Sequence, residues 1–242
     1  MEEKEKITSL QAEKLVYIGG ATASIIHDIN TPLTCIGGFL QLYLKLLQQP
    51  DISIERLKNA QSYLERALSE TKRCQNLVHD LLVFVHQGKQ TFKEVSLYNL
   101  FQNIIDLLGE QLYDCNVTLD IFCEQWIVIE GNEDQLQQVF TNLIMNAKNA
   151  MPQGGSITIH VQSKEDTIEI VVSDTGIGIS ENNLSQIFEP FFTTRSAGKG
   201  TGLGLAICKQ IIQEHGGTIT VESILNQGTT FIITLPKNIM RN

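Results

Sequence analysis

A histidine followed directly by an aspartate stands in the segment IIHDINTPLT, residues 25–34. A neutral imidazole is a competent nucleophile near pH 7, and a neighbouring carboxylate can take the proton released when the imidazole attacks. His27 and Asp28 therefore have the residue types needed for nucleophilic catalysis. Thr31 lies one helical turn after His27 on the same face of a helix. The remaining histidines are interpreted as ordinary surface residues: His79, His86, His160 and His215.

The apolar pattern around His27 predicts that this histidine faces water. Steps of three and four residues run from Leu15 to Ile29 and again from Leu33 to Leu47, which is typical of a helix with one apolar seam. At about 100° per residue, His27 points away from that seam. The seam shifts by one residue at Pro32. Because proline cannot donate to the carbonyl of Asp28, we expect a bend beneath His27.

A second helix with a heptad pattern follows the segment QQPDIS, where Asp51 or Ser53 is expected to be the N-cap. Two stripes repeat every seven residues: Leu57, Leu64, Thr71, Val78 and Val85, and Ala60, Ala67, Cys74 and Leu81. A single partner helix does not cover both stripes. The hairpin is therefore expected to form a homodimeric four-helix bundle.

From Phe92 onward the pattern changes to alternating strands and helices. Helices are expected over 97–112, 133–151 and 203–214, and strands over 117–122, 126–130, 156–163, 167–174, 218–223 and 229–236. This order indicates an α/β sandwich with helices on one face of a mixed sheet. The predicted fold class is α+β, with a hairpin domain over 1–90 and a second domain over 91–242, joined by the linker HQGKQ.

Two segments of the second half carry polar groups in patterns that favour nucleotide binding. In NLIMNAKNA, Asn142, Asn146 and Asn149 share one helix face, and a carboxamide can ligate Mg²⁺ through oxygen or donate to phosphate through nitrogen. A polar helix face is the alternative interpretation. In VVSDTGIGIS, Asp174 ends a strand before Gly176 and Gly178, so it can accept a hydrogen bond from the adenine amine. A simple turn is the alternative there.

The third segment, GKGTGLGLAI, places glycines at every second position before a helix begins. Backbone N–H groups followed by a helix N-terminus form a cradle for anions. The pattern is not a Walker A motif, because Lys199 is followed by Gly200 instead of serine or threonine. The preceding FEPFFTTR carries Phe188, Phe191 and Phe192 in an apparent loop, which suits a lid over a ligand.

Composition excludes several other classes of protein. The chain has 242 residues, of which 42% are hydrophobic and 19% charged, as in ordinary globular proteins. A net charge of −9 argues against nucleic acid as a partner. No apolar run reaches the length of a membrane span, and the acidic start is unlike a signal peptide, so a cytoplasmic protein is expected. Five cysteines without a CxxC pair are expected to be reduced thiols.

Together and in this order, the motifs resemble the catalytic core of a two-component sensor histidine kinase. In that family a dimerisation and histidine-phosphotransfer hairpin precedes a Bergerat-type ATP-binding domain. The resemblance covers about residues 12–236 and rests on HDINTPL, NLIMNAKNA, DTGIGI, FEPFF and GTGLGL. It implies autophosphorylation by ATP with Mg²⁺, and transfer of the phosphoryl group to an aspartate of a response regulator receiver domain.

The resemblance also implies roles for individual residues. His27 would be the phosphoacceptor, Asp28 the base, and Thr31 the residue that holds water for dephosphorylating the regulator, where many relatives carry asparagine. Asn146 would ligate Mg²⁺, and Asp174 would bind adenine. The rest of the implied ATP site consists of Asn142, Asn149, Gly176, Gly178, Phe191, Arg195, Lys199, Gly200, Thr201, Gly202, Leu203, Gly204 and Thr229.

Two other functions compete with this interpretation. An ATPase switch of the gyrase, mismatch-repair or heat-shock chaperone kind would account for the pocket, but it would account for neither the hairpin nor HDINTPL. A phosphotransfer or scaffold protein with a decayed ATP site is the second alternative. The intact Asn146, Asp174 and glycine sets argue against decay.

Overall fold

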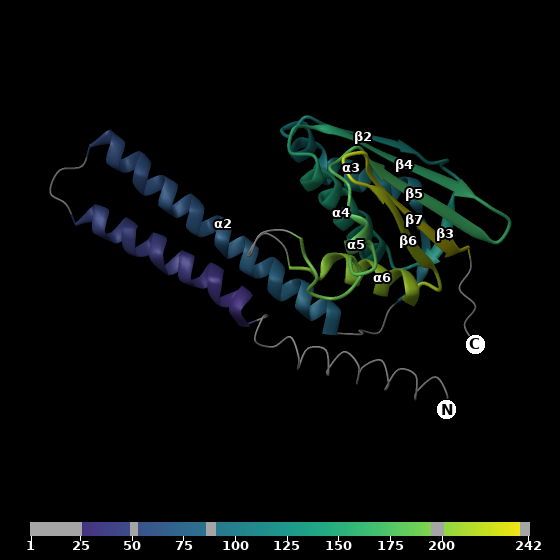
Figure 1. The fold of residues 1–242 in the computed structure, drawn as a ribbon, viewed down its shortest axis with the longest axis horizontal. Helices are drawn as coiled ribbons and strands as arrows, with labels where there is room; N and C mark the ends of the chain where they lie inside the picture. The colour runs from purple at the N-terminus through teal and green to yellow at the C-terminus, as the bar shows by residue number, and fades with distance from the viewer. Residues whose placement is uncertain (1–25, 49–52, 86–90, 195–200, 238–242) are drawn as a thin grey trace, which may run out of the picture. The chain divides into compact units, whose positions relative to one another are not determined.

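The computed structural model describes residues 26–48, 53–85, 91–194 and 201–237, with the side chains of residues 79–80 and 83–85 outside the description. The chain divides into two compact units (Figure 1). The first holds the helical hairpin and comprises residues 1–87 and 193–203, and the second holds the sheet and comprises residues 88–192 and 204–242. The predicted domain boundary at residue 90 stays a prediction, because residues 86–90 lie outside the described part. The predicted seam before residue 26 lies outside it as well.

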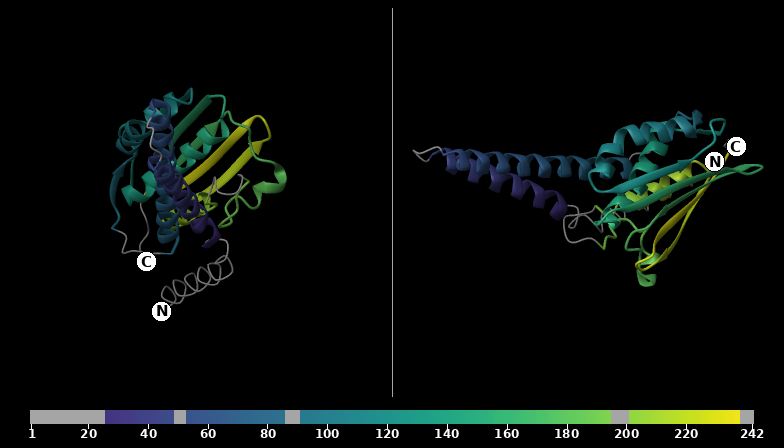
Figure 2. Two further views of the ribbon diagram at one scale, coloured as in Figure 1. Left: turned by 90° about the vertical axis from the view of Figure 1, so that its left-hand side faces the viewer. Right: turned by 90° about the horizontal axis from the view of Figure 1, so that it is seen from above.

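The hairpin consists of a first helix over residues 26–47 and helix α2 (Ile54–Val85), which lie side by side in both views of Figure 2. Ser53 caps α2, since its hydroxyl accepts the backbone N–H of Arg56 at 3.3 Å. The other predicted cap, Asp51, lies outside the described residues. The first helix continues through Pro32, which is buried. The proline therefore removes one backbone donor without ending the helix.

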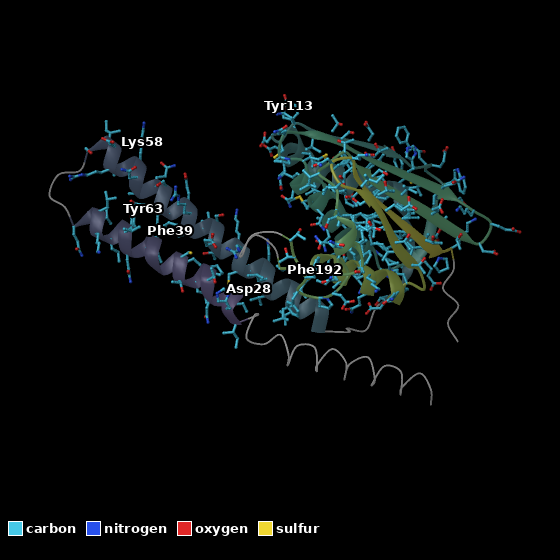
Figure 3. All side chains as sticks on the ribbon, viewed as in Figure 1. Asp28, Phe39, Lys58, Tyr63, Tyr113 and Phe192 are labelled. Carbon is cyan, nitrogen blue, oxygen red and sulfur yellow. The ribbon has the colours of Figure 1, made fainter. Side chains whose placement is uncertain are left out.

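Small residues of α2 face the first helix. Ala60 and Ala67 are 5% and 6% exposed, so the backbones of the two helices can approach closely there. Phe39 of the first helix and Tyr63 of α2 are labelled in Figure 3. Their rings stack across the hairpin with centroids 6.5 Å apart, and the Arg66 guanidinium lies 5.9 Å from the centre of the Phe39 ring. The predicted Ala60 stripe is therefore the intramolecular contact of the hairpin.

The sheet unit contains a five-stranded mixed sheet in the order β2-β4-β5-β7-β6. Its strands are β2 (Val117–Phe122), β4 (Gly155–Ser163), β5 (Thr167–Asp174), β6 (Thr218–Ile224) and β7 (Gly228–Pro236). Only β2 and β4 pair in parallel, and the other neighbours are antiparallel. A separate antiparallel pair joins β1 (Lys93–Ser96) to β3 (Val128–Gly131).

Helices α3 (Leu97–Tyr113), α4 (Glu133–Ala150) and α6 (Gly204–Glu214) lie on one side of the sheet, and α5 (Glu181–Leu184) is a single turn (Figure 1). Alternate residues of the central strands are buried beneath these helices, including Ile157, Ile170 and Ile233. Phe101 and Phe140 join α3 to α4 edge to face at 4.8 Å. The predicted fold class, a helical hairpin followed by an α/β domain, is confirmed.

The starts of α3 and α4 are set by side-chain caps. The Ser96 hydroxyl accepts the backbone N–H of Asn99 at 3.4 Å, and the Asn132 side-chain oxygen accepts that of Gln135 at 3.0 Å. Each cap satisfies one of the backbone donors that a helix N-terminus leaves without a partner. The asparagine-bearing helix α4 therefore begins at a fixed position against β3.

Candidate functional site

His27 lies on the exposed side of the first helix, as predicted. Its side chain is 71% exposed, and its Nδ1 lies 3.3 Å from Oδ1 of Asp28. A carboxylate beside Nδ1 favours the tautomer with the proton on Nδ1, which leaves the lone pair of Nε2 directed to solvent. The Thr31 hydroxyl donates to the backbone carbonyl of His27 at 2.8 Å. The geometry thus provides an accessible nitrogen nucleophile with an adjacent acceptor for its proton.

The three asparagines of α4 differ in exposure. Asn142 and Asn146 are half-buried, whereas Asn149 is exposed at the last turn of the helix. The Asn142 carboxamide donates to the carbonyl of Gly204, the first residue of α6, at 3.4 Å. The end of α4 is also tied to the turn after β5, because Ile177 donates its N–H to the carbonyl of Ala150 at 3.0 Å. Helix α4 therefore lies between α6 and that turn.

Asp174 ends β5 and begins the turn DTGIG. Its Oδ1 accepts the backbone N–H of Gly176 at 2.8 Å. Burial raises the pKa of the Asp174 carboxyl above its ordinary value, and backbone hydrogen bonds from Gly176 and Thr229 partly oppose that shift. Thr229 is directly opposite Asp174 on β7 and is 5% exposed. The two side chains therefore point to the same face of the sheet. There the half-buried carboxylate of Asp174 can accept a hydrogen bond from a ligand.

Glycine is required at two positions of this turn by its close neighbours. A Cβ at Gly176 would lie 2.8 Å from the Cβ of Ala150 and 2.8 Å from Oδ1 of Asp174. Gly178 has φ +66°, and a Cβ there would clash with the carbonyl of Ile224. The turn is thus held against both α4 and the β6–β7 connection, which fixes the direction of the Asp174 side chain.

The glycine-rich segment is described from Thr201 onward. The Thr201 hydroxyl accepts the backbone N–H of Leu203 at 3.1 Å, Gly202 has φ +66°, and Leu203 is buried. Helix α6 then begins at Gly204, with no acidic residue in its first turn. Three further predicted residues lie outside the described part of the chain: Arg195, Lys199 and Gly200.

The FEPFF segment is anchored at its start. Phe188 packs edge to face on Phe231 of β7 at 6.3 Å, and the Lys209 ammonium lies 5.7 Å from the Phe188 ring. Phe191 is half-buried and has φ +64°, an uncommon conformation for a bulky residue that marks a tight turn. Phe188 thus fixes the start of this segment on the sheet, whereas its predicted use as a lid over a ligand stays a prediction.

Helices α4 and α6 run antiparallel and are joined at three levels. Besides the contact between Asn142 and Gly204, the Cys208 thiol points to the carbonyl of Val139 at 3.7 Å. At the far end, His215 Nε2 accepts the backbone N–H of Asn132, the cap of α4, at 3.0 Å.

The interpretation of His215 as a surface residue was wrong, since it is 1% exposed. His215 continues the buried helix face of Cys208 and Ile211, and this spacing is the signal that sequence reasoning missed.

The neutral form of His215 is the one that fits its surroundings. Nδ1 lies 2.8 Å from the carbonyl of Ile211 and must donate to it, while Nε2 must accept from Asn132. Burial lowers the pKa of His215, and the Ile211 hydrogen bond and the Glu214 charge oppose that shift. Protonation would turn the acceptor Nε2 into a donor facing another donor.

Acidification is expected to reduce the free energy of unfolding through His215. The pKa of His215 is lower in the folded state than its value of about 6.5 in the unfolded chain. At pH values below about 6.5, the unfolded chain therefore binds more protons at this residue than the folded chain does. The contribution of neutral His215 to the free energy of unfolding is complete above about pH 6.5 and is lost as the pH falls below that value. In His215→Gln, urea unfolding should show a loss of about 1–3 kcal/mol at pH 7.5. The loss relative to wild type should shrink at lower pH.

The donor chemistry of the site fits a nucleotide with a magnesium ion. The described residues contain no group of three or more His, Cys, Asp or Glu side chains that could hold a metal by themselves. Mg²⁺ commonly takes one or two protein oxygens and completes its shell with water and substrate phosphates. A carboxamide such as that of Asn146, near a helix N-terminus suited to phosphate, meets this need.

Two family models match the chain, one for each half. Residues 18–89 match the His Kinase A (phospho-acceptor) domain, and residues 131–239 match the histidine kinase-, DNA gyrase B-, and HSP90-like ATPase. A solved structure of the catalytic domain of histidine kinase ThkA, free of nucleotide, is 33% identical to this chain and has a TM-score of 0.55. The match covers 61% of this chain and 97% of that one. This chain belongs to the sensor histidine kinases. It carries the catalytic core of a protein histidine kinase, as the motifs predicted.

The kinase core also resembles longer proteins. Sporulation kinase D of Bacillus subtilis is 35% identical over 93% of this chain, and sporulation kinase A of the same organism is 36% identical over 94%. This chain spans 43% and 36% of their respective lengths. Histidine kinase ThkA, solved in complex with the response regulator protein TrrA, is 30% identical with a TM-score of 0.77, over 97% of this chain and 66% of that one.

No helix within the described part of the kinase core is both long enough and apolar enough to cross a membrane.

Proposed function

We propose that this chain transfers the γ-phosphoryl group of ATP to His27 and then to an aspartate of a response regulator receiver domain, in two-component signal transduction. The observation that carries the proposal is the exposed imidazole of His27 with Asp28 at its Nδ1, on a hairpin that matches the phospho-acceptor family. The receiver partner is supported by the relative solved with a response regulator. Retained phosphatase activity toward that regulator is part of the proposal.

In the proposed first step, Nε2 of His27 attacks the γ-phosphorus in line. The nitrogen–phosphorus bond forms while the bond from the γ-phosphorus to its bridging oxygen breaks, so that ADP leaves. The imidazole then releases its Nδ1 proton to Asp28, 3.3 Å away. Positioning and charge neutralisation supply most of the rate enhancement in phosphoryl transfer. Mg²⁺, when bound, would neutralise phosphate charge, with Asn146 as its protein ligand.

The ATP site is proposed to lie between α4, the turn at Asp174 and the start of α6. Asp174 would accept the adenine amine, with Thr229 and the two glycines of the turn beside it. Asn142, Asn149 and the segment from Phe191 to Gly204, including Arg195 and Lys199, would surround the phosphates. Thr31 would hold the water that attacks the phosphorylated regulator. The roles of Asp174 and Thr229 rest on the family motif and on the described geometry, whereas those of Thr31, Arg195 and Lys199 rest on the family motif alone.

The decisive experiment incubates the purified chain with γ-labelled ATP and Mg²⁺ and tests the chemistry of the label. A phosphorylated imidazole is hydrolysed in acid and survives alkali, so acid-labile and alkali-stable label is the expected result. The label should then move to an added receiver domain and not to its aspartate-to-asparagine variant. A chain that binds ATP, takes no label and still hydrolyses ATP would favour an ATPase switch instead.

We also propose that the hairpin dimerises into a four-helix bundle through side chains that the single chain leaves in water. On α2 the predicted outer stripe is exposed at Leu57, Leu64 and Val78, which are 53%, 41% and 39% exposed. On the first helix Leu33, Leu40 and Leu47, again seven residues apart, are 50%, 42% and 47% exposed. A second copy would cover both stripes, and burying each leucine contributes up to about 1.5–3 kcal/mol.

A charge within this outer stripe is expected to dissociate the dimer. Leu64→Glu would bury a carboxylate in the bundle core, so its mass in sedimentation equilibrium should fall from twice 27.0 kDa toward 27.0 kDa. Leu107→Glu is the matched control, because Leu107 is 55% exposed on α3, outside the hairpin. A wild-type chain that sediments as a monomer at micromolar concentration would contradict the dimer.

A further inference from the structure

A row of three polar side chains crosses three strands at the proposed adenine site. Asp174 on β5 is opposite Thr229 on β7, and Thr229 is in turn opposite Ser223 on β6. Residues directly opposite each other on neighbouring strands point to the same face of a sheet. Ser223 is therefore the next side chain in line behind the pair proposed to bind adenine, and neither the motifs nor the family match assign it a role.

The Ser223 hydroxyl has three polar neighbours. It donates to the carbonyl of Gly228 at 2.8 Å, and it accepts the backbone N–H of Ile179 at 2.8 Å. Its third neighbour is Oγ1 of Thr229, at 3.0 Å. Ile179 directly follows the turn that begins at Asp174, so Ser223 joins the end of that turn to both strands of the β6–β7 hairpin.

This arrangement fixes the direction of the Thr229 proton. A serine hydroxyl has one proton and two acceptor sites, and the proton of Ser223 is directed to Gly228. Thr229 must then donate its own proton to Ser223, which leaves only lone pairs of Thr229 to face a ligand. Asp174, when ionised, is also an acceptor without a proton. The two neighbouring groups thus present acceptors alone.

We propose that Ser223 is a positioning residue for base selection, which holds Thr229 as an acceptor so that the site favours 6-amino over 6-oxo purines. The proposal rests on the proposed function, in which ATP binds at Asp174. An amino group at position 6 of the purine offers protons to these acceptors, directly or through a bridging water. An oxo group at the same position offers lone pairs, which two acceptors repel.

The chain contains a matched control row on the other face of the same strands. Ser173 of β5 lies opposite Thr230 of β7, and their hydroxyl oxygens are also 3.0 Å apart. Because consecutive strand residues point to opposite faces, this pair faces away from Asp174. Ser173→Ala therefore removes a similar serine–threonine hydrogen bond from the same sheet without touching the proposed base site.

The experiment measures the dissociation constants of ATP and ITP by calorimetry, since ITP replaces the 6-amino group by an oxo group. In Ser223→Ala the Thr229 hydroxyl is free to rotate and donate. The preference for ATP over ITP is expected to fall about tenfold relative to wild type. Ser223→Thr, which keeps a hydroxyl, should retain most of the preference, and Ser173→Ala should retain all of it.

A double-variant cycle separates positioning from a general loosening of the turn. In a Thr229→Val background, which has no hydroxyl to orient, Ser223→Ala should leave the ratio of ATP to ITP affinity unchanged. A purely structural role would weaken both nucleotides equally and leave the ratio unchanged in every background. That result overturns the inference while wild-type ATP binding and labelling of His27 stand. Wild type that binds neither nucleotide overturns the proposed function and the inference with it.

Discussion

Replacing His27 with glutamine is expected to lower the incorporation of phosphate from γ-labelled ATP by on the order of a thousandfold or more, because the attacking nitrogen is removed. Glutamine retains a polar side chain of similar length, so the exposed first helix should keep its fold. The affinity for ATP, measured by calorimetry, should stay at the wild-type value, because none of the residues proposed to bind ATP lies on the first helix or on α2.

The control for this substitution is another exposed histidine. His160 stacks on Phe122 at 4.5 Å on the sheet surface and has no proposed part in catalysis. His160→Gln should take up label at the wild-type rate. Undiminished acid-labile label in His27→Gln would show that a different histidine is the acceptor. A lower rate in Asp28→Asn, with the label still on His27, would support proton transfer from Nδ1.

Asp174→Asn is expected to weaken ATP binding about a hundredfold, since a hydrogen bond to a charged group contributes about 1.5–3 kcal/mol and the variant also presents an amide donor to the adenine amine. The substitution keeps the shape of the side chain, and its carboxamide oxygen can still accept the Gly176 N–H. Titration calorimetry gives the affinity, and thermal unfolding verifies the fold. Asp120→Asn on the exposed face of β2 is the control with the same chemical change.

The affinity for ATP should also depend on pH through Asp174. Burial raises the pKa of this carboxyl, so the ionised acceptor is complete above the raised pKa and is lost as the pH falls through it. Wild-type affinity should therefore decline on acidification at a higher pH than an ordinary carboxyl would cause. That component should be missing from Asp174→Asn. An identical pH profile in both proteins would exclude Asp174 as the titrating group.

The long elements were predictable because each buries one face. The alternation of 167–174 predicted β5 to the residue, and the prediction for β4 missed only Gly155. The two stripes of α2 were predicted from their spacing, and the structure assigns Ala60 and Ala67 to the intramolecular contact and leaves Leu57 and Leu64 in water. The spacing of apolar residues predicts the extent of an element and its buried face, because packing one face against a partner imposes a regular spacing.

Elements and contacts without a period escaped prediction. Strand β1 and helix α5 have four residues each, too few for an alternation or a helical stripe to be recognised. Ser223 lies 49 positions beyond Asp174 in sequence and reaches its row only through the pairing of β6 with β7 and of β7 with β5. Hydrogen-bond rows across strands depend on register, which no single strand specifies.

The pairing of β5 with β7 has a consequence for the order of folding. Hairpins β4–β5 and β6–β7 each join neighbouring segments, whereas β5 pairs with β7 across the whole stretch that holds α5 and α6, with Asp174 meeting Thr229. Contacts between residues distant in sequence form late, because loop closure must precede them. The row that is proposed to bind the base therefore forms only once β7 has paired with both β5 and β6. A chain in which β5 has not yet paired with β7 would lack the Asp174–Thr229 pair that is proposed to bind adenine.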